Sequence, residues 1–560
     1  MADFLEKLQA IIKPSVDELL DTGWLDALPR NDYLAALDTA VIRLRAFAAD
    51  ENPYDHAALG ALRAIDIRCR ENVSALSKQY VAAPVLAHEV DERLWQSVYN
   101  YHHVLERAYQ AFLERHGSAL AASPIASDLP QLLLNIVDCQ RCMAKWRYLR
   151  YQSMMEGGWL KLHRLYQMAE RLDCASTPLR RYPDQPETTL LSSYMQALML
   201  DTLNHTSMLK GEIELVADYL ADWCGTLLAE ADYDEKRHLF FTCLDEDRGG
   251  RRIRHFQPSP QNRYWEVDSV VRLIEQLQLD ASRSGMLPVM LSHGVSAEDM
   301  QLMTEHMLGE WSRSFYLRQR RTDEREAVVK VATVMNGILN VCQHVKNVIY
   351  SRGRVVQNDG IEASSPATAE TPAATEQDGA MVLGFGAERW LIQNESKFGF
   401  GAEVHSESNL WLRPGKLIAL DYELNPDMPV VGVVRSVKQR PEGMRHVGIE
   451  VLCHTPSYVR LRSLPHGARE EGFLPGDVFL ATALSTHGPA PFPALYLTKD
   501  EERDVPPTLL LPRVEFIAGG VFELRTDQHH SQVRLGRVIE QKDDWVRVEM
   551  HLPEPGAAAA

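Results

Sequence analysis

The hydrophobic pattern of the chain changes once, and this change constrains the fold more than any single motif does. From about residue 3 to residue 311, apolar side chains recur at intervals of three and four, as in Val41, Leu44 and Phe47. This is the period of an amphipathic helix. Beyond residue 326, apolar and polar residues alternate within short segments, and Pro, Gly, Asn and Asp separate these segments. This pattern is typical of short strands and turns. The sequence therefore predicts an α+β multidomain protein in which an all-helical array precedes β-rich units.

The length of 560 residues is enough for about three domains. No repeat of constant length is found in the helical region, so a repeat solenoid is not supported. We expect an all-helical domain at 1–312, a first antiparallel β-barrel at 313–453, a second small β-barrel or sandwich at 454–553 and a disordered tail at 554–560.

The first β unit is predicted to contain an insertion. A Val-rich strand at 326–337 ends on Asn-Gly, and 338–351 has the apolar spacing of a helix. The stretch 353–380 is dominated by Ala, Ser, Thr, Pro, Glu and Asp, a composition that buries little and is expected to be flexible. The whole insertion spans 338–380. Further strands are predicted at 388–394, 399–405, 416–423, 429–437 and 446–452.

The second β unit carries no motif of its own. Its alternating segments are short and are separated by Pro and Gly, as in a small barrel or sandwich. Strands are predicted at 477–483, 494–497, 508–511, 521–525, 533–539 and 545–551.

Two short motifs are the candidates for a binding site. The first is an arginine cluster that includes Arg320, Arg321 and Arg325, and guanidinium groups suit bidentate capture of phosphate or stacking on a purine. The second is Asn-Glu-Ser-Lys-Phe-Gly at 394–399, in which two short polar side chains precede a glycine that permits close approach to the backbone.

These motifs resemble the R-x-x-x-R and D/N-x-S-x-x-G signatures of the PilZ domain, the bacterial receptor for cyclic di-GMP. The segments 412–420, 431–435 and 446–451 are similar to its later strands. The resemblance implies that Arg321 and Arg325 hold phosphates and guanine faces and that Arg320 assists. It also implies that Asn394, Ser396 and Gly399 hold the guanine edge. The chain departs from the PilZ pattern in two ways. It has an Asn in place of Asp, and 73 positions separate Arg321 from Asn394.

The layout is similar to that of large proteobacterial PilZ proteins with a long N-terminal helical region. That resemblance implies a cyclic di-GMP receptor that relays the messenger to a protein partner through the helical domain, in control of motility, attachment or biofilm formation. The alternative is a degenerate PilZ-like protein-interaction scaffold that binds no nucleotide.

Composition limits the other partners. The net charge is −18, from 59 basic and 77 acidic residues, so nucleic acid is not expected to bind. A local arginine cluster still suits a small dianion, because distant charges are screened. No apolar run is long enough for a membrane span, the N-terminus lacks the pattern of a signal peptide, and eight scattered cysteines suit a reducing compartment. We expect a cytoplasmic protein.

Several other groups of cysteines, arginines and histidines are explained more simply by burial or surface exposure than by a catalytic, redox or metal-binding role. Cys139 and Cys142 are spaced as C-x-x-C within a helical pattern, which indicates burial on or near one helix face rather than a metal or redox site. The run 251–255 is interpreted as a charged surface loop, and His405, His454 and the pair 529–530 as surface residues. No catalytic residue, metal ligand or cofactor is predicted, and we expect no enzymatic activity.

Overall fold

The computed structural model describes residues 21–49, 55–82, 88–116, 124–254, 258–284, 295, 297–313, 326–358, 388–405, 409, 411–422, 425–464, 490–501, 505–526, 530–542 and 544–551. The chain divides into two compact units, Met1–Arg320 and Arg321–Ala560.

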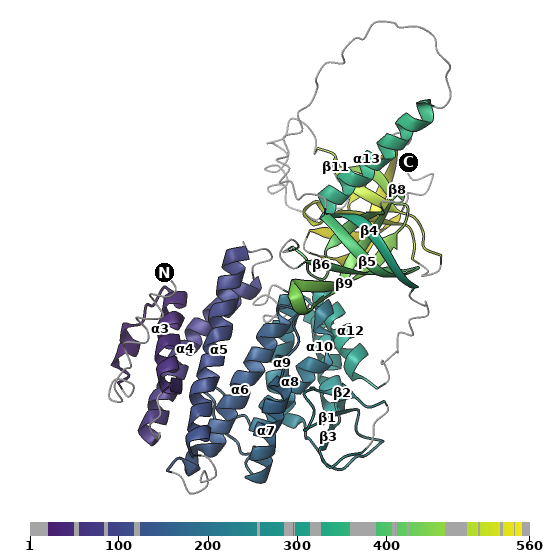
Figure 1. Ribbon diagram of the computed structural model, residues 1–560. Helices are drawn as coiled ribbons and strands as arrows, with labels where there is room; N and C mark the ends of the chain where they lie inside the picture. Colours follow the sequence, from purple (N-terminus) through teal and green to yellow (C-terminus); the bar gives the residue numbers. More distant parts are fainter. Residues whose placement is uncertain are drawn as a thin grey trace, which may run out of the picture. The chain divides into compact units, whose positions relative to one another are not determined.

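The first unit is mainly helical (Figure 1). Its α-helices are α3 (Tyr33–Ala49), α4 (His56–Ala82), α5 (His88–His116), α6 (Leu129–Tyr148), α7 (Gly158–Arg171), α8 (Leu190–Thr202), α9 (Lys210–Trp223), α10 (Asp268–Ser284) and α12 (Ala297–Trp311). Short 3₁₀ turns lie at Gly23–Ala27, Ala126–Asp128, His205–Ser207 and Cys224–Thr226.

Side chains cap the starts of two helices, one from a neighbouring residue and one from a distant residue. The hydroxyl of Thr189 accepts a hydrogen bond from the amide of Ser192 at 3.0 Å and caps α8. The carboxylate of Asp247, which is distant in the sequence, accepts from the amides of Gly157 and Trp159 at the start of α7. A negative charge is favourable there because the helix dipole and free amides point toward it.

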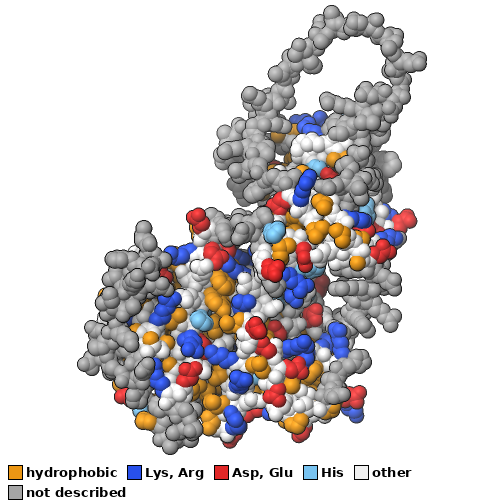
Figure 2. All heavy atoms as spheres, viewed as in Figure 1, with side chains coloured by type: hydrophobic (Ala, Val, Ile, Leu, Met, Phe, Trp, Pro, Cys, Tyr) orange, Lys and Arg blue, Asp and Glu red, His pale blue; other side chains and the backbone are white. Residues whose placement is uncertain are grey.

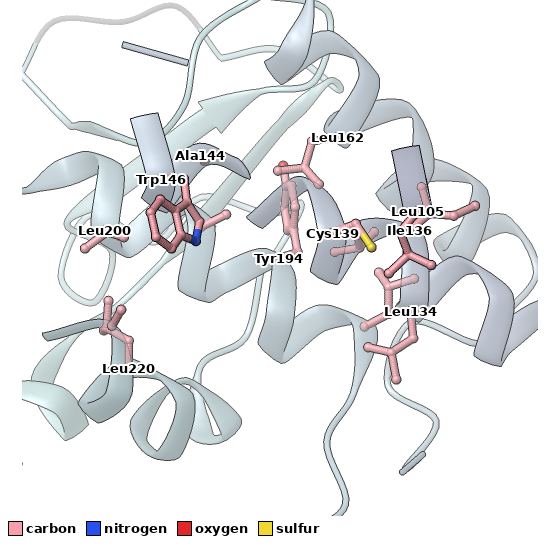
Figure 3. Close-up of a cluster of buried hydrophobic side chains, with 14 of the residues drawn as sticks. Leu105, Leu134, Ile136, Cys139, Ala144, Trp146, Leu162, Tyr194, Leu200 and Leu220 are labelled. Carbon is pink, nitrogen blue, oxygen red and sulfur yellow. The ribbon is translucent and has the colours of Figure 1, made fainter. Parts of the chain in front are cut away.

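Helix α6 is the central element of this unit. It contacts α5, α7, α8 and α9, and buried residues occur on nearly all of its sides, as expected for a helix enclosed by others. Figure 3 shows part of the surrounding core, in which Cys139 and Trp146 of α6 lie among apolar side chains of α5, α7, α8 and α9.

A buried ionic network crosses the same helices. Arg181, in the segment between α7 and α8, lies 2.5 Å from the carboxylate of Asp66 on α4 and 3.4 Å from that of Asp138 on α6. The hydroxyl of Tyr109 on α5 donates to Asp66 at 2.8 Å. Burial by itself raises the pKa of Asp138, but the nearby Arg141 and Arg181 lower it to about 2. The network therefore holds ionised groups inside the core and ties three helices to one loop.

The first unit also contains a small antiparallel sheet. Its order is β2–β1–β3, from β1 (Phe240–Cys243), β2 (Arg251–Arg252) and β3 (Asn262–Trp265). The prediction of an all-helical domain is wrong in this segment. The surface loop predicted at 251–255 is wrong over its first two residues, because Arg251 and Arg252 pair with β1, whereas 253 and 254 lie outside the strand and residue 255 lies outside the described residues. These strands are too short to show a clear alternation.

Replacing Arg181 tests the buried network. We expect Arg181→Met to lower the free energy of unfolding of the helical unit by about 3–5 kcal/mol, because Asp66 keeps a buried charge without its partner. Arg180→Met is the matched control, since Arg180 lies 59% exposed beside Glu187 and its loss is expected to cost less than about 1 kcal/mol. Urea denaturation measures both variants, and equal losses would contradict a structural role of the network.

The second unit begins with a closed six-stranded antiparallel barrel (Figure 1). Its order is β4–β5–β6–β9–β8–β7. The strands are β4 (Glu326–Asn336), β5 (Glu388–Ser396), β6 (Gly399–His405), β7 (Leu417–Tyr422), β8 (Asn425–Gln439) and β9 (Met444–Cys453), and α13 (Ile338–Asn358) follows β4.

A second closed barrel repeats this connectivity. Its order is β10–β11–β12–β15–β14–β13, so both barrels place their six strands in the order 1-2-3-6-5-4 along the sheet. The strands are β10 (Ser457–Ser463), β11 (Phe492–Leu497), β12 (Thr508–Pro512), β13 (Val521–Arg525), β14 (His530–Gln541) and β15 (Trp545–His551).

Helix α13 joins the two barrels through a shared core. Its buried residues Val341, Cys342 and Val345 pack with side chains of both barrels. The first barrel contributes Leu417, Ala419, Val431, Val433, Leu452 and Cys453, and the second contributes Leu495, Leu497, Leu510 and Trp545. The two barrels therefore form one compact unit.

Polar contacts reinforce this junction. The guanidinium of Arg435 on β8 binds both carboxylate oxygens of Glu540 on β14, and the indole nitrogen of Trp545 donates to the carbonyl of Gly415 at 2.9 Å. Burial opposes the charge of Arg435, but its bonds to Glu540 and the attraction of Glu540 and Glu450 raise its pKa above the ordinary value. This bidentate pair fixes β8 against the second barrel.

The predicted fold class is confirmed: a helical array is followed by two closed barrels. Helix α13 reaches Asn358, so the flexible stretch predicted from 353 is wrong over its first residues. Three predicted features lie outside the described residues: the remainder of that stretch, the strand at 477–483 and the tail at 554–560. The first strand of the second barrel is β10, which was not predicted.

Two substitutions on α13 test the shared core. Val345 is fully buried, and we expect Val345→Ala to destabilise both barrels together by about 1–3 kcal/mol because it opens a cavity between them. Leu339 on the same helix is 59% exposed, so Leu339→Ala is expected to have little effect. Hydrogen exchange of β7 and β11 amides measures the outcome. Faster exchange in only one barrel would show that they unfold independently.

Candidate nucleotide-binding site

The second predicted motif forms the hairpin between β5 and β6. Ser396 pairs with Gly399 and Asn394 pairs with Gly401, with a register shift between Ile392 and Asn394. Phe400 and Ala402 are buried, and side chains alternate along a strand. Gly399 and Gly401 therefore lie on the outer surface of the barrel, together with their partners on β5.

A row of small and polar residues crosses four strands on this outer surface. Asn394 on β5 pairs with Gly401 on β6, Gly401 pairs with Gly448 on β9, and Gly448 pairs with Ser436 on β8. Paired residues of an antiparallel sheet lie side by side on one face. The side chains of Asn394 and Ser436 lie directly over the backbone of Gly401 and Gly448.

Each glycine of this region is constrained by a neighbour. A β-carbon at Gly399 would lie 2.6 Å from the carbonyl oxygen of Ile449 on the next strand. A β-carbon at Gly401 would lie 2.5 Å from the amide nitrogen of the Asn394 side chain. Gly399 is therefore required by close backbone packing, whereas Gly401 makes room for the side chain of Asn394.

Residues Arg320, Arg321 and Arg325 lie outside the described residues. The backbone next to them is described: Glu326 pairs with Glu395, and Ala327 pairs with Asn394. Glu326, the residue after the arginine motif, therefore lies beside the Asn-x-Ser motif in the sheet. The pairing of β4 with β5 thus brings together two segments that the insertion separates in the sequence.

One ion pair lies on the same outer face as the row: Arg435 on β8 contacts Glu450 on β9 at 2.6 Å. A second pair, Lys330 with Glu395 at 2.6 Å, belongs to the opposite face, because these residues pair with the buried Ile392 and Phe400. Glu450 pairs with Gly399. The outer face thus offers amide, hydroxyl and charged groups side by side, which suits a polar ligand with hydrogen-bonding edges.

The match to a known protein family lies in the first, helical unit. Residues 21–232 match the family model described as "Cyclic-di-GMP receptor FimW, N-terminal domain". No curated protein matches the chain. The FimW-like region covers the helices from α3 to α9 and ends before the sheet of the first unit. The match indicates similarity to a cyclic di-GMP receptor, but it does not include the first barrel, so the PilZ resemblance stays a prediction.

Other predicted features have clear positions. Cys139 is buried, Cys142 is partly buried and neither forms a disulfide, and burial raises the pKa of both thiols. This confirms the structural interpretation of the C-x-x-C spacing.

His405, His454 and His530 are exposed, as predicted, and residue 529 lies outside the described residues. Among the described residues no group of His, Cys, Asp and Glu could hold a metal ion, and no helix is long and apolar enough to span a membrane.

The places of Gly401, Gly448 and Ser436 on this face were not predicted from the sequence. Gly401 follows the motif at the alternate position, and Gly448 lies within a segment that was interpreted only as a strand. An isolated glycine in a strand signals close approach of another group, so this signal was present. Ser436 carries no such signal, because only the register of β8 against β9 places it beside Gly448.

Alanine substitutions at Gly399 and Gly401 of β6 test the different constraints on these two glycines. We expect Gly399→Ala to destabilise the first barrel by about 1–3 kcal/mol, because the backbone of β9 must shift away from the new methyl group. Gly401→Ala is expected to leave stability within about 0.5 kcal/mol, since the end of the Asn394 side chain is able to rotate away. Hydrogen exchange of β6 and β9 amides measures both variants, and an equal loss would show that Asn394 is rigidly held.

Proposed function

We propose that this protein is a nonenzymatic cyclic di-GMP receptor whose nucleotide site lies on the outer face of the first barrel. The observation that carries the proposal is the pairing of β4 with β5, in which Glu326, the residue after the arginine motif, pairs with Glu395 of the Asn-x-Ser motif. The match of residues 21–232 to the N-terminal domain of a cyclic di-GMP receptor supports the same ligand from a different part of the chain.

The two motifs supply complementary chemistry for this ligand. Arg321 and Arg325 would bind the phosphates and stack on guanine, with Arg320 assisting, because guanidinium groups combine positive charge with a planar face. Asn394 and Ser396 would form directional hydrogen bonds to the guanine edge, and Gly399 would allow the base to approach the backbone. In this proposal the barrel acts as a PilZ domain and needs no other cofactor.

The second barrel is not proposed to bind nucleotide. Leu495 and Leu510 lie on its second and third strands, β11 and β12, which correspond by order to β5 and β6. Both side chains are buried in the core shared with α13 and the first barrel. The proposal therefore assigns one nucleotide-binding face to each chain.

The proposed output is a protein partner that contacts the helical domain, with control of motility, attachment or biofilm formation. We propose a cytoplasmic location, supported by cysteines that are scattered along the chain and unpaired among the described residues. Nucleic acid is not a proposed partner, because a net charge of −18 repels a polyanion on average.

Calorimetric titration of the full chain with cyclic di-GMP tests the proposal. Wild type is expected to bind, and Arg325→Ala is expected to lose about 1.5–3 kcal/mol of binding free energy, the range for hydrogen bonds to charged groups. Arg537→Ala is the matched control, because Arg537 lies 78% exposed on the second barrel. Absence of binding by wild type, or unchanged affinity in the Arg321→Ala and Arg325→Ala double variant, would remove the proposed role of the motif.

A second candidate function is a protein-interaction scaffold that no longer binds nucleotide. It is favoured by apolar side chains exposed on β4 and β5 of the first barrel: Val329 is 85% exposed, Leu391 40% and Val331 37%. Figure 2 shows apolar side chains gathered over these strands. Such clusters on a soluble surface are typical of interaction sites. The same titration separates the two functions, since a scaffold gives no heat of binding with cyclic di-GMP.

A further inference from the structure

A groove between the start of α10 and the end of α12 has room for a small ligand. Its volume is about 590 Å³, and small-molecule sites usually have roughly 300–1,000 Å³. The residues that line it are Asp268, Val271, Arg272, Ser312 and Arg313. Helices α10 and α12 pack together (Figure 1), and all five residues belong to the first unit. The groove lies beyond the segment 21–232 that matches the family model.

Three of the lining residues are held in place by the surrounding structure. Ser312 is buried, and its carbonyl accepts a hydrogen bond from Arg252 at 3.1 Å. Val271 packs against the hydrophobic core of the unit. The guanidinium of Arg313 donates to two backbone carbonyls of the segment before β1, at 3.1 and 3.2 Å. These walls are formed without a ligand, so binding requires little additional ordering.

The groove presents charges of both signs. The two partners of Arg313 are neutral carbonyls, so they leave its positive charge uncompensated. Asp268 and Arg272 are exposed and lie one helical turn apart on α10, a spacing that permits an ion pair. Within the described part of the chain, however, neither side chain takes part in an ion pair. Two guanidinium groups and one carboxylate are therefore available to a ligand.

This combination of charges selects the class of ligand. A purely anionic ligand, such as an acidic peptide or a free phosphate, meets repulsion from Asp268. A guanine nucleotide satisfies both kinds of group. Its phosphate suits guanidinium groups, and the adjacent N–H donors at N1 and N2 of the base suit the two oxygens of one carboxylate. Val271 offers an apolar surface to the face of the ring.

We propose that this groove is a guanine nucleotide site, in addition to the face on the first barrel. Arg272 and Arg313 hold a phosphate group, and Asp268 accepts hydrogen bonds from the guanine edge. The choice of cyclic di-GMP as the nucleotide rests on the proposed function, whereas the choice of residues does not. The messenger then contacts the helical unit directly as well as the barrel.

Calorimetric titration with cyclic di-GMP tests the groove in a full-length chain that lacks the barrel motif. This background carries Arg321→Ala and Arg325→Ala, and we expect it to bind. Adding Arg272→Ala or Arg313→Ala is expected to weaken binding about tenfold or more, the effect of losing hydrogen bonds to a charged group. Arg283→Ala is the matched control, because Arg283 is also exposed on α10 but lies about 16 Å further along the helix. Thermal unfolding checks that each variant is folded.

A change of Asp268 separates a guanine nucleotide site from a site for any anion. Asp268→Asn removes the charge and one acceptor, so we expect the background with this change to bind cyclic di-GMP about tenfold more weakly. In a general anion site the same change removes a repulsive charge and strengthens binding. Cyclic di-AMP is the second probe. It carries the same phosphates without the donor pair at N1 and N2, so it is expected to bind the background more weakly than cyclic di-GMP does.

The outcomes for the groove and for the proposed function are distinguishable. If wild type binds cyclic di-GMP and the background does not, the groove is overturned and the proposed function stands. If the background binds as wild type does and Arg272→Ala removes binding, the groove stands and the barrel motif loses its proposed role. The inference is also overturned by background binding that Arg272→Ala and Arg313→Ala leave unchanged, by equal affinity for cyclic di-AMP, or by tighter binding of Asp268→Asn. Absence of binding by wild type overturns both.

Discussion

The burial of α13 between the two barrels is the interaction on which the second unit depends. Val341, Cys342 and Val345 fill a core to which both barrels contribute apolar side chains, and burial of apolar surface is the main favourable term in folding. Because β11 and β12 direct Leu495 and Leu510 into this core, the second barrel cannot present the same face to a ligand. The first barrel keeps its β5–β6 face outside the shared core. Packing thus places corresponding faces of two barrels with one strand order in different environments.

The same arrangement explains how the first barrel tolerates a long insertion between its first two strands. The cost of closing a loop grows only with the logarithm of its length, so the chain between β4 and β5 adds little more than a short loop would. The register Glu326 to Glu395 is then set by side chains such as Trp390 and Ile392, which must face the barrel interior. Part of the insertion, α13, also supplies the core between the barrels. The insertion therefore stabilises the unit that it interrupts.

Many elements were predictable because their signals are local. The strands from Glu388 to Cys453 alternate strongly between turn residues, and the structure places them within a few residues of the prediction. The sheet of the first unit was missed because β2 has only two residues. Strand β10 was missed although Val459 and Leu461 alternate with Arg460 and Arg462, so attention to this pattern would have found it. The common strand order of the two barrels leaves no visible repeat in the sequence, because a barrel needs alternation rather than particular residues.

By itself the sequence determined the change from helices to strands, the class of both β units and the motif at 394–399, because periodicity and turn residues act over a few positions. Only the tertiary structure decided which residues share a face. The alignment of Asn394, Gly401, Gly448 and Ser436 depends on the register of four strands, and the network around Arg181 joins residues more than a hundred positions apart. Such proximity arises from pairing and packing between distant segments, where one register has a lower free energy than its alternatives, and no local pattern encodes it.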